Sequence, residues 1–247
     1  MKVSFVIPTF NHAAWLPHAV KSCQEQTHKD IEIVIIDDFS TDTTNQYIDW
    51  LLKQGDTRIV YKRNEKNMGR SYCRNLGNKI SIGEITCVLD SDDVAAPDRA
   101  ILTMKKLTKC QVCYGSATAM NAIGLSLGEI TARPLNVPAS LTPITNWRDD
   151  LEKGIVELRE NGIVHSTMGY LRDIALKYPY AEGNISDLGI DDWDQQIRMM
   201  RDGVIFDYIP DSICAYRRHG EGISQTRDPI EVMKLKASIL EGVKCSQ

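Results

Sequence analysis

Short apolar runs alternate with amphipathic stretches through the first 110 residues of the chain. Residues 3–7, 31–36 and 85–89 are almost continuously apolar, and residues 58–62 form a shorter run of the same kind. A continuous aliphatic run is typical of a strand that is buried on both faces, as in a parallel sheet covered by helices. Between these runs, apolar residues recur at helical spacing. The pattern therefore predicts a doubly wound α/β sheet, mainly parallel and flanked by helices.

The second half of the chain has a less regular pattern. Its strand-like segments are residues 112–120, 204–210 and 213–216. Residues 133–145 are rich in proline and small residues, which predicts a loop or flap. Residues 147–161 are expected to form an amphipathic helix, and a last helix is expected after Pro229. We find no internal repeat or low-complexity segment, and a chain of 247 residues could form one large α/β domain or two small ones.

Polar residues stand at the ends of three of the four predicted strands. They are residues 8–11, 37–38 and 90–93. In doubly wound sheets the carboxyl ends of the strands meet at one edge, and ligands bind outside that edge. Helix capping could explain each polar cluster singly. Three clusters together favour a binding site at this edge.

Three acids, Asp90, Asp92 and Asp93, lie within four residues of each other. Carboxylates packed at one place repel each other, and a bound cation relieves that repulsion. Oxygen ligands of this kind suit Mg²⁺ or Mn²⁺, particularly when phosphate oxygens complete the coordination shell. On this stretch alone, a solvated acidic turn that caps the next helix is an equal alternative.

Composition narrows the class of protein. The formal net charge of −4 argues against a nucleic-acid partner. No apolar run is long enough to span a bilayer, and the chain begins in a strand-like run rather than a signal peptide.

Seven scattered cysteines suggest reduced thiols in a cytoplasmic protein. Cys110 and Cys113 form a C-x-x-C without a second pair, so we expect a plain strand there. Neither a G-x-G-x-x-G loop nor a Walker-type loop is present, which disfavours dinucleotide oxidoreductases and P-loop enzymes.

Taken in order, these segments resemble the family 2 glycosyltransferases of the GT-A fold. The matching segments are residues 6–11 (VIPTFN), 36–42 (IDDFSTD), 67–70 (NMGR) followed by Arg74-Asn75, and Gly83-Glu84 leading to residues 89–93 (LDSDD). Phe39 stands where many members carry glycine. Looser likenesses are residues 161–167 (NGIVHST), 191–194 (DDWD, where glutamate is more common at Asp191) and 216–219 (YRRH). The likeness ends near residue 224.

The resemblance implies a Rossmann-like doubly wound mixed sheet in a single GT-A domain. Residues 1–110 would bind the donor, residues 111–224 would bind the acceptor and carry the catalytic group, and residues 225–247 would form a C-terminal helix. It further implies an inverting transfer of a hexosyl or N-acetylhexosaminyl group from a metal-bound UDP-sugar. The acceptor would be a saccharide or a lipid-linked hydroxyl in polysaccharide biosynthesis. We expect a cytoplasmic location without a transmembrane segment, including peripheral association with the inner face of the membrane.

The same resemblance implies roles for individual residues. The residues expected at the nucleotide are Pro8, Thr9, Asn11, Asp38, Arg70, Arg74, Asp90, Ser91 and Arg217. The family pattern does not decide whether Arg70 or Arg74 makes the contact with the nucleotide. A divalent cofactor, Mn²⁺ or Mg²⁺, would be held by Asp92 and His219, with Asp90 facing the ribose or the metal shell. Asp192 is the expected catalytic base and Asp191 the second candidate. Trp193 would offer a flat apolar face to the acceptor sugar.

The chemistry of transfer needs these residue types. A base must take the proton of the attacking hydroxyl, and a cation must stabilise the departing diphosphate. Plainer interpretations remain open from the residues alone. Asp191 and Asp192 could cap a helix, His219 could lie in a solvated basic turn, and His165 is expected to be a packed or capping residue. The alternative functions are a nucleotidyltransferase and a non-catalytic nucleotide-sugar binding protein.

Overall fold

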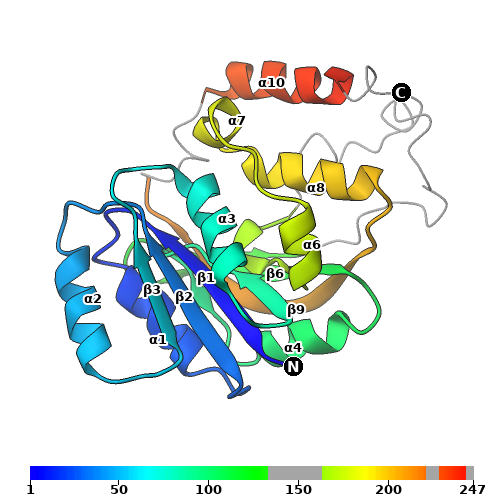
Figure 1. The fold of residues 1–247 in the computed structure, drawn as a ribbon. Helices are drawn as coiled ribbons and strands as arrows, with labels where there is room; N and C mark the ends of the chain where they lie inside the picture. Colours follow the sequence, from blue (N-terminus) through cyan, green and yellow to red (C-terminus); the bar gives the residue numbers. More distant parts are fainter. Residues whose placement is uncertain (133–162, 221–227, 243–247) are drawn as a thin grey trace.

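The computed structural model describes residues 1–132, 163–220 and 228–242. A single sheet runs through it in the strand order β3-β2-β1-β4-β8-β6-β9-β5, and β7 pairs with β6. The first four strands in the chain are parallel neighbours: β1 (Val3–Thr9), β2 (Ile31–Asp37), β3 (Ile59–Arg63) and β4 (Ile85–Val88). Figure 1 shows this sheet in the lower part of the molecule. The predicted mixed and mainly parallel α/β sheet is confirmed.

The rest of the chain extends the same sheet beyond β4. Its strands are β5 (Val94–Ala95), β6 (Val112–Asn121), β7 (Ser126–Ile130), β8 (Gly169–Leu171) and β9 (Phe206–Arg218). The short β8 runs antiparallel between β4 and β6, whereas β9 runs parallel to β6. The two strand-like segments expected at residues 204–210 and 213–216 are one strand of 13 residues. A register shift, in which Gly115 pairs with Ile209 and Ser116 with Ser212, explains the interruption in the sequence pattern.

Helices cover both faces of the sheet. Those on one face are α1 (Leu16–Gln24), α2 (Thr44–Lys53) and α4 (Arg99–Lys106), and those on the other are α3 (Arg70–Ile80) and α6 (Arg172–Lys177). Beyond α3 and α6 lie α7 (Asn184–Asp187), α8 (Asp191–Arg201) and α10 (Pro229–Gly242), with α10 outermost (Figure 1). A 3₁₀ turn, η2 (His165–Thr167), precedes β8. The expected loop at residues 133–145 and the expected helix at 147–161 lie outside the described residues.

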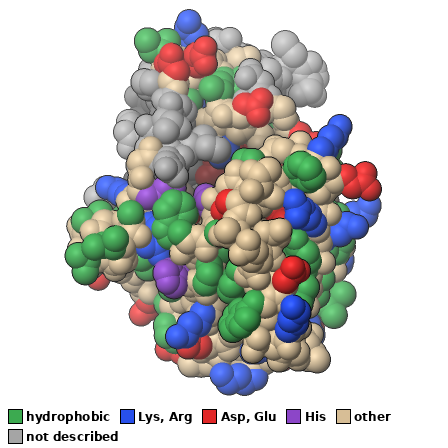
Figure 2. Space-filling view, turned by 90° about the vertical axis from the view of Figure 1, so that its left-hand side faces the viewer, with side chains coloured by type: hydrophobic (Ala, Val, Ile, Leu, Met, Phe, Trp, Pro, Cys, Tyr) green, Lys and Arg blue, Asp and Glu red, His purple; other side chains and the backbone are tan. Residues whose placement is uncertain are grey.

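The surface carries both positively and negatively charged side chains (Figure 2). Basic and acidic side chains are interspersed on the face shown in Figure 2, as expected for a chain with a formal net charge of −4. Among the helices of the described residues, none is long and apolar enough to cross a membrane.

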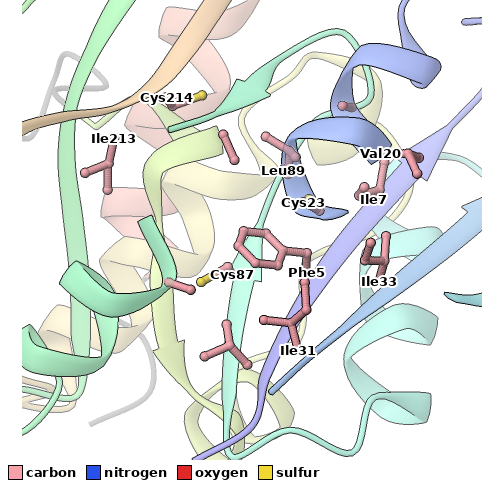
Figure 3. Packing of buried hydrophobic residues seen from close by; sticks show 14 of the residues in the cluster. Phe5, Ile7, Val20, Cys23, Ile31, Ile33, Cys87, Leu89, Ile213 and Cys214 are labelled. Atoms are coloured by element: carbon pink, nitrogen blue, oxygen red, sulfur yellow. The ribbon is translucent and has the colours of Figure 1, made fainter. Parts of the chain in front are cut away.

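Alternate residues of the central strands build two cores. Phe5 and Ile7 of β1 and Ile33 of β2 point toward α1, where Val20 and Cys23 meet them (Figure 3). Val6, Val34 and Ile36 point to the opposite face and pack on α3. Burial of each such side chain contributes about 1.5–3 kcal/mol relative to an exposed one. Because both faces are covered, the strands are apolar at most positions, as the sequence pattern indicated, and the buried polar residues Ser4 and Glu32 are hydrogen-bonded to each other.

The C-x-x-C segment is part of this core. Cys110 and Cys113 are buried free thiols, and Cys113 lies within β6. The described part of the chain contains no cluster of three or more metal-ligating side chains. The expected strand begins at Val112 and includes Cys113, whereas Cys110 precedes it.

Candidate active site

The loops that follow β1 and β2 are joined to each other at the carboxyl edge of the sheet. Asn11 Oδ1 accepts the backbone N–H groups of Thr41 and Asp42 at 2.7 and 3.3 Å. In return, the backbone N–H of Asn11 donates to Ser40 Oγ at 3.0 Å. The expected nucleotide residue Asn11 thus shapes both loops. Beside it, Thr9 is buried at the end of β1, and its hydroxyl has no partner among the described residues.

Asp38 orders the loop that begins α3. Its carboxylate accepts the N–H groups of Met68 at 2.7 Å and Gly69 at 2.8 Å, and Asn64 Nδ2 donates to it at 2.8 Å. Gly69 immediately precedes α3 with a φ of 87°, a conformation that glycine adopts readily. Asp38 is therefore buried behind this loop, and a contact with a nucleotide base stays a prediction.

Asp92 and His219 lie against each other, although 127 positions separate them in the chain. His219 Nε2 is 2.9 Å from Asp92 Oδ2, and both side chains are largely buried. The indole of Trp15 packs on the imidazole of His219 with ring centroids 4.2 Å apart. The His12 ring lies close to the same two rings, with centroids 5.1 Å from Trp15 and 6.1 Å from His219. Its Nδ1 lies 2.7 Å from the hydroxyl of Ser91, and burial lowers the pKa of His12.

The Asp92–His219 pair fits a divalent metal ion. Two adjacent ligands of an octahedral Mg²⁺ ion, each about 2.1 Å from the metal, are about 3 Å apart, close to the observed 2.9 Å. Such ions commonly take one or two protein ligands and complete their shell with phosphate oxygens and water. His219 Nδ1 is buried without a hydrogen-bond partner among the described residues, so this ring has one polar atom left unsatisfied. The residues present thus fit the expected cofactor.

Asp90 faces α3 rather than the Asp92–His219 pair. Its Oδ1 accepts Arg74 Nη2 at 2.7 Å, and its backbone N–H donates to Ser166 Oγ at 3.0 Å. Burial, the largest single cause, acts to raise the pKa of Asp90, but the charge and hydrogen bond of Arg74, together with the charges of His165 and Arg70, outweigh burial and hold that pKa below its usual range. Asp90 is therefore an ionised partner of Arg74, and its contact with a ribose or metal stays a prediction.

The next acid, Asp93, is enclosed completely. Its Oδ1 accepts the backbone N–H of Arg217 at 2.8 Å. Burial and the neighbouring carboxylates of Asp92 and Asp90 raise its pKa well above the ordinary value. The three acids of the turn consequently have different environments, and Asp93 acts as a structural residue.

Arg217 supports the same turn from β9. Its Nε donates to the carbonyl of Asp92 at 2.7 Å, and its Nη1 donates to the carbonyls of Asn121 and Ala122 at 3.3 and 2.8 Å. The guanidinium is buried and bound to backbone oxygens. In this structure it positions Asp92, and a direct contact with a diphosphate stays a prediction.

Both candidate nucleotide arginines contact Asp191 at the start of α8. Arg74 Nη1 lies 2.7 Å from Asp191 Oδ2, and Arg70 Nη2 lies 2.8 Å from Asp191 Oδ1. Asp192, the next residue along α8, is buried and accepts the backbone N–H of Trp193 at 2.8 Å. The structure therefore brings the acidic pair of α8 close to the strand edge through α3.

Trp193 lies away from this edge. Its side chain is 2% exposed and packs with Ile190, Ile197 and Val232 of the α8–α10 layer. The ammonium of Lys236 lies 4.8 Å from the ring centroid. The ring thus has the surroundings of a core side chain, and its proposed contact with an acceptor sugar stays untested.

Sequence reasoning missed several residues of the site. His12, Trp15, Ser71 and Ser166 contact predicted site residues but were not proposed. Trp15 lies just before α1, where an aromatic residue carries no distinctive signal. The one local hint was the position of His12 directly after the predicted polar residues 8–11.

Solved structures share this architecture. TarS of S. aureus in complex with UDP-GlcNAc superposes with a TM-score of 0.72 at 19% sequence identity, covering 97% of this chain and 66% of that chain. A mannosyltransferase of Pyrobaculum calidifontis in complex with GDP-Man and Mn²⁺ superposes with a TM-score of 0.62 at 15% identity, covering 99% and 75%. The fold is that of the GT-A glycosyltransferases.

Sequence comparison matches part of the chain to a family. Residues 4–122 match glycosyl transferase family 2. An uncharacterized glycosyltransferase of Rickettsia felis is 40% identical over 104 residues, which are 42% of this chain and 17% of the relative. An uncharacterized glycosyltransferase of Methanocaldococcus jannaschii is 28% identical over 216 residues, which are 87% of this chain and 70% of the relative. Over residues 4–122 the chain therefore matches the family 2 glycosyltransferases.

Proposed function

We propose that this chain is an inverting glycosyltransferase that moves a sugar from a nucleotide-diphospho-sugar, UDP-linked, to a hydroxyl acceptor. The observation that carries the proposal is the convergence of two acidic sites. Arg74 connects the turn that carries Asp92 to the acidic start of α8, because it contacts both Asp90 and Asp191 at 2.7 Å, and Asp92 in the same turn pairs with His219. The similar solved structures bind UDP-GlcNAc, or GDP-Man with Mn²⁺.

Asp92 and His219 would hold the divalent ion, Mn²⁺ or Mg²⁺. When bound, that ion supplies positive charge to the departing diphosphate. The chain itself fixes the two ligands firmly. Arg217 holds the backbone of Asp92, and Trp15 packs against the ring of His219. Residues held in this way keep their geometry through the reaction, which is the requirement for preorganised electrostatic stabilisation.

Asp192 would act as the catalytic base. Inversion at the anomeric carbon requires one direct attack by the acceptor hydroxyl, whose proton a carboxylate takes. Asp192 sits in the first turn of α8. The nucleoside pocket at the ends of β1 and β2 would be lined by Pro8, Thr9 and Asp38. Asn11 and Ser91 would lie beside them.

The donor sugar would be a hexose or an N-acetylhexosamine, and the acceptor a saccharide or a lipid-linked hydroxyl. We propose a cytoplasmic location, including the inner membrane face for a lipid-linked acceptor. The six cysteines of the described residues are free thiols, which suits a reducing compartment. Fractionation of cells into cytosol, membrane and extracellular medium tests this location, and recovery of the protein outside the cell would contradict it.

A donor panel tests the activity directly. We expect release of free nucleotide from one of UDP-glucose, UDP-GlcNAc and GDP-mannose in the presence of Mn²⁺. Asp192→Asn should lower that release by about 10²–10⁴-fold, the usual contribution of a general base, while UDP binding by calorimetry stays within about threefold. Unchanged turnover in Asp192→Asn would contradict the base assignment.

The same panel separates the alternatives. A nucleotidyltransferase would release pyrophosphate from a nucleoside triphosphate and a sugar phosphate. A binding protein would hold the donor without turnover in the wild-type chain. Either result would replace the proposed activity, whereas nucleotide release that depends on Asp192 supports it.

A further inference from the structure

The carboxylate of Asp191 is surrounded by hydrogen-bond donors. Arg70 reaches Oδ1 through Nε at 3.0 Å and through Nη2 at 2.8 Å. Ser71 Oγ and Arg74 Nη1 reach Oδ2 at 2.9 and 2.7 Å. An ionised carboxylate has about four lone-pair sites, and three hydrogen bonds together with the ion-pair contact of Arg70 Nη2 take up most of them. Asp191 is 1% exposed, which also keeps substrate away from it.

These contacts join two separate elements. Arg70, Ser71 and Arg74 belong to the first turns of α3, and Asp191 is the first residue of α8, more than 110 positions later in the chain. We call this set of contacts between α3 and Asp191 the joint. Two further bonds strengthen it: Arg70 Nη2 also donates to the carbonyl of Ser186, and Ser71 Oγ is 2.8 Å from Ser186 Oγ. The start of α8 is therefore fixed to the start of α3.

Arg74 extends this joint to the donor side of the site. Its Nη2 binds Asp90, directly after β4, while its Nη1 binds Asp191. The planar guanidinium holds both carboxylates in one rigid geometry, which a lysine ammonium does not reproduce. One buried arginine thereby sets the spacing between the acidic turn after β4 and the acidic start of α8.

We propose that Asp191 is a positioning residue that fixes the N-terminal turn of α8, and with it Asp192, at a set distance from the donor site through Arg74 and Arg70. The inference rests on the proposed function. It revises the sequence-based expectation that Asp191 is a second candidate base. A base needs an unoccupied lone pair and a pKa near the working pH. Burial opposes ionisation of Asp191, but the charges of Arg74 and Arg70 still hold its pKa below the ordinary value.

The substitution Asp191→Asn tests the joint, and Asp194→Asn in the same helix is a matched control. Asp194 is also buried and ion-paired, but its partner is Arg198 at 2.8 Å, one turn further along α8. Both variants lose one buried carboxylate charge, and only Asp191→Asn loosens the contact with α3. Three quantities are measured: amide hydrogen exchange in the first turn of α8, binding of UDP with Mn²⁺, and kcat against pH with the best donor of the panel.

We expect Asp191→Asn to speed exchange of the Asp194 amide, which bonds to the carbonyl of Ile190, by at least tenfold. Its kcat should fall about tenfold, in the range that misplacement of a reacting group produces. The dissociation constant for UDP–Mn²⁺ should change by less than threefold. The acid limb of the pH profile should persist at reduced height, because Asp192 still has to lose its proton. Asp194→Asn should change kcat by less than threefold.

Three results would overturn the proposal. Loss of the acid limb in Asp191→Asn would make Asp191 the base. A tenfold weaker affinity for UDP–Mn²⁺ with unchanged exchange would make it a donor ligand. Equal changes in amide exchange and kcat for Asp191→Asn and Asp194→Asn would show that the contact between α3 and α8 does not position Asp192.

Two provisions keep these results decisive. If Asp191→Asn does not fold, Ser71→Ala is used instead, because it removes one of the four contacts. It should speed amide exchange and lower kcat, as expected for Asp191→Asn, but to a smaller extent. Unchanged exchange and kcat in a folded Ser71→Ala variant would count against the joint. If the wild-type chain turns over no donor, the proposed function fails, and the exchange measurement still decides whether the joint fixes α8.

Discussion

At the residue scale, unusual backbone geometry occurs at the candidate donor site. Among the described residues, Asn11 and Phe39 are the non-glycine residues with positive φ, at 54° and 67°. Each lies two residues beyond the end of a strand, β1 or β2. For a bulky residue such as Phe39 the left-handed conformation costs about 1–2 kcal/mol. Strain of this kind persists where surrounding contacts impose it, and here the guanidinium of Arg63 lies 5.2 Å from the ring centroid of Phe39.

The strain at Phe39 predicts an unusual order of stability. Phe39→Ala keeps the strained backbone and loses the ring, whereas Phe39→Gly loses the ring and relieves the strain. We therefore expect the glycine variant to be more stable than the alanine variant by about 1 kcal/mol, measured by urea unfolding. Phe10 is the control, because it is similarly exposed and its φ is not positive. There the alanine variant should be the more stable one. The same order at both positions would contradict strain at Phe39.

At the scale of elements, α3 packs unusually close to the sheet. A Cβ atom added at Gly77 would lie 2.4 Å from Cγ1 of Val6 in β1, closer than any real contact. The missing side chain lets α3 approach β1 and brings its first turn, with Arg70 and Arg74, over the strand edge. The helix–sheet distance thus helps to set the geometry of the site.

Gly77→Ala should therefore destabilise the protein by about 1–3 kcal/mol, the usual cost of overpacking a filled core. The measurement is urea unfolding of the single variants Gly77→Ala and Val6→Ala and of the double variant. Because Val6→Ala removes the atom that the new methyl group meets, the double variant should be more stable than the sum of the single effects. Strict additivity would show that the contact with Val6 is not the cause.

The same scale shows what the sequence pattern could predict. Strands β1, β2 and β4 are buried on both faces, so each is a plain apolar run, and their order and helices were predicted correctly. β9 was expected as two pieces because Pro210 and Asp211 lie at its register shift and are exposed. β5, β8 and α6 were missed, because two, three and six residues are too few to show a period.

At the scale of the whole molecule, the sequence supplied the polar residues of the site but not their pairing. Arg70 and Arg74 were expected at the nucleotide, yet in the structure both hold Asp191. The partner of each arginine depends on how α8 packs on α3, and no local pattern encodes that packing. By contrast, Asp92 and His219 were proposed to share a metal and lie 2.9 Å apart. The carboxylates of the acidic turn indicated Mg²⁺ or Mn²⁺, and the resemblance to the family added His219 as a second ligand.

This pairing predicts that binding of the nucleotide and of the metal stabilises the whole fold jointly. A ligand at 100 times its dissociation constant adds about 2.7 kcal/mol to the free energy of unfolding. For a chain of this size, that should raise the melting temperature by about 5–10 °C. We expect UDP with Mn²⁺ to give this shift in a thermal melt, and UDP with a chelator to give a much smaller one.

The ligand Asp92 should account for the difference between the two melts. Asp92→Asn removes a charged oxygen ligand, so its melting temperature with UDP should be nearly the same with Mn²⁺ and with chelator. Asp207→Asn is the matched control, because it loses an exposed ion pair with Lys106 on the outer part of β9 and should keep the metal-dependent shift. If UDP raised the melting temperature of the wild-type protein equally with and without metal, the donor site would not contain a metal ion. Asp92 and His219 would then be a structural hydrogen-bonded pair.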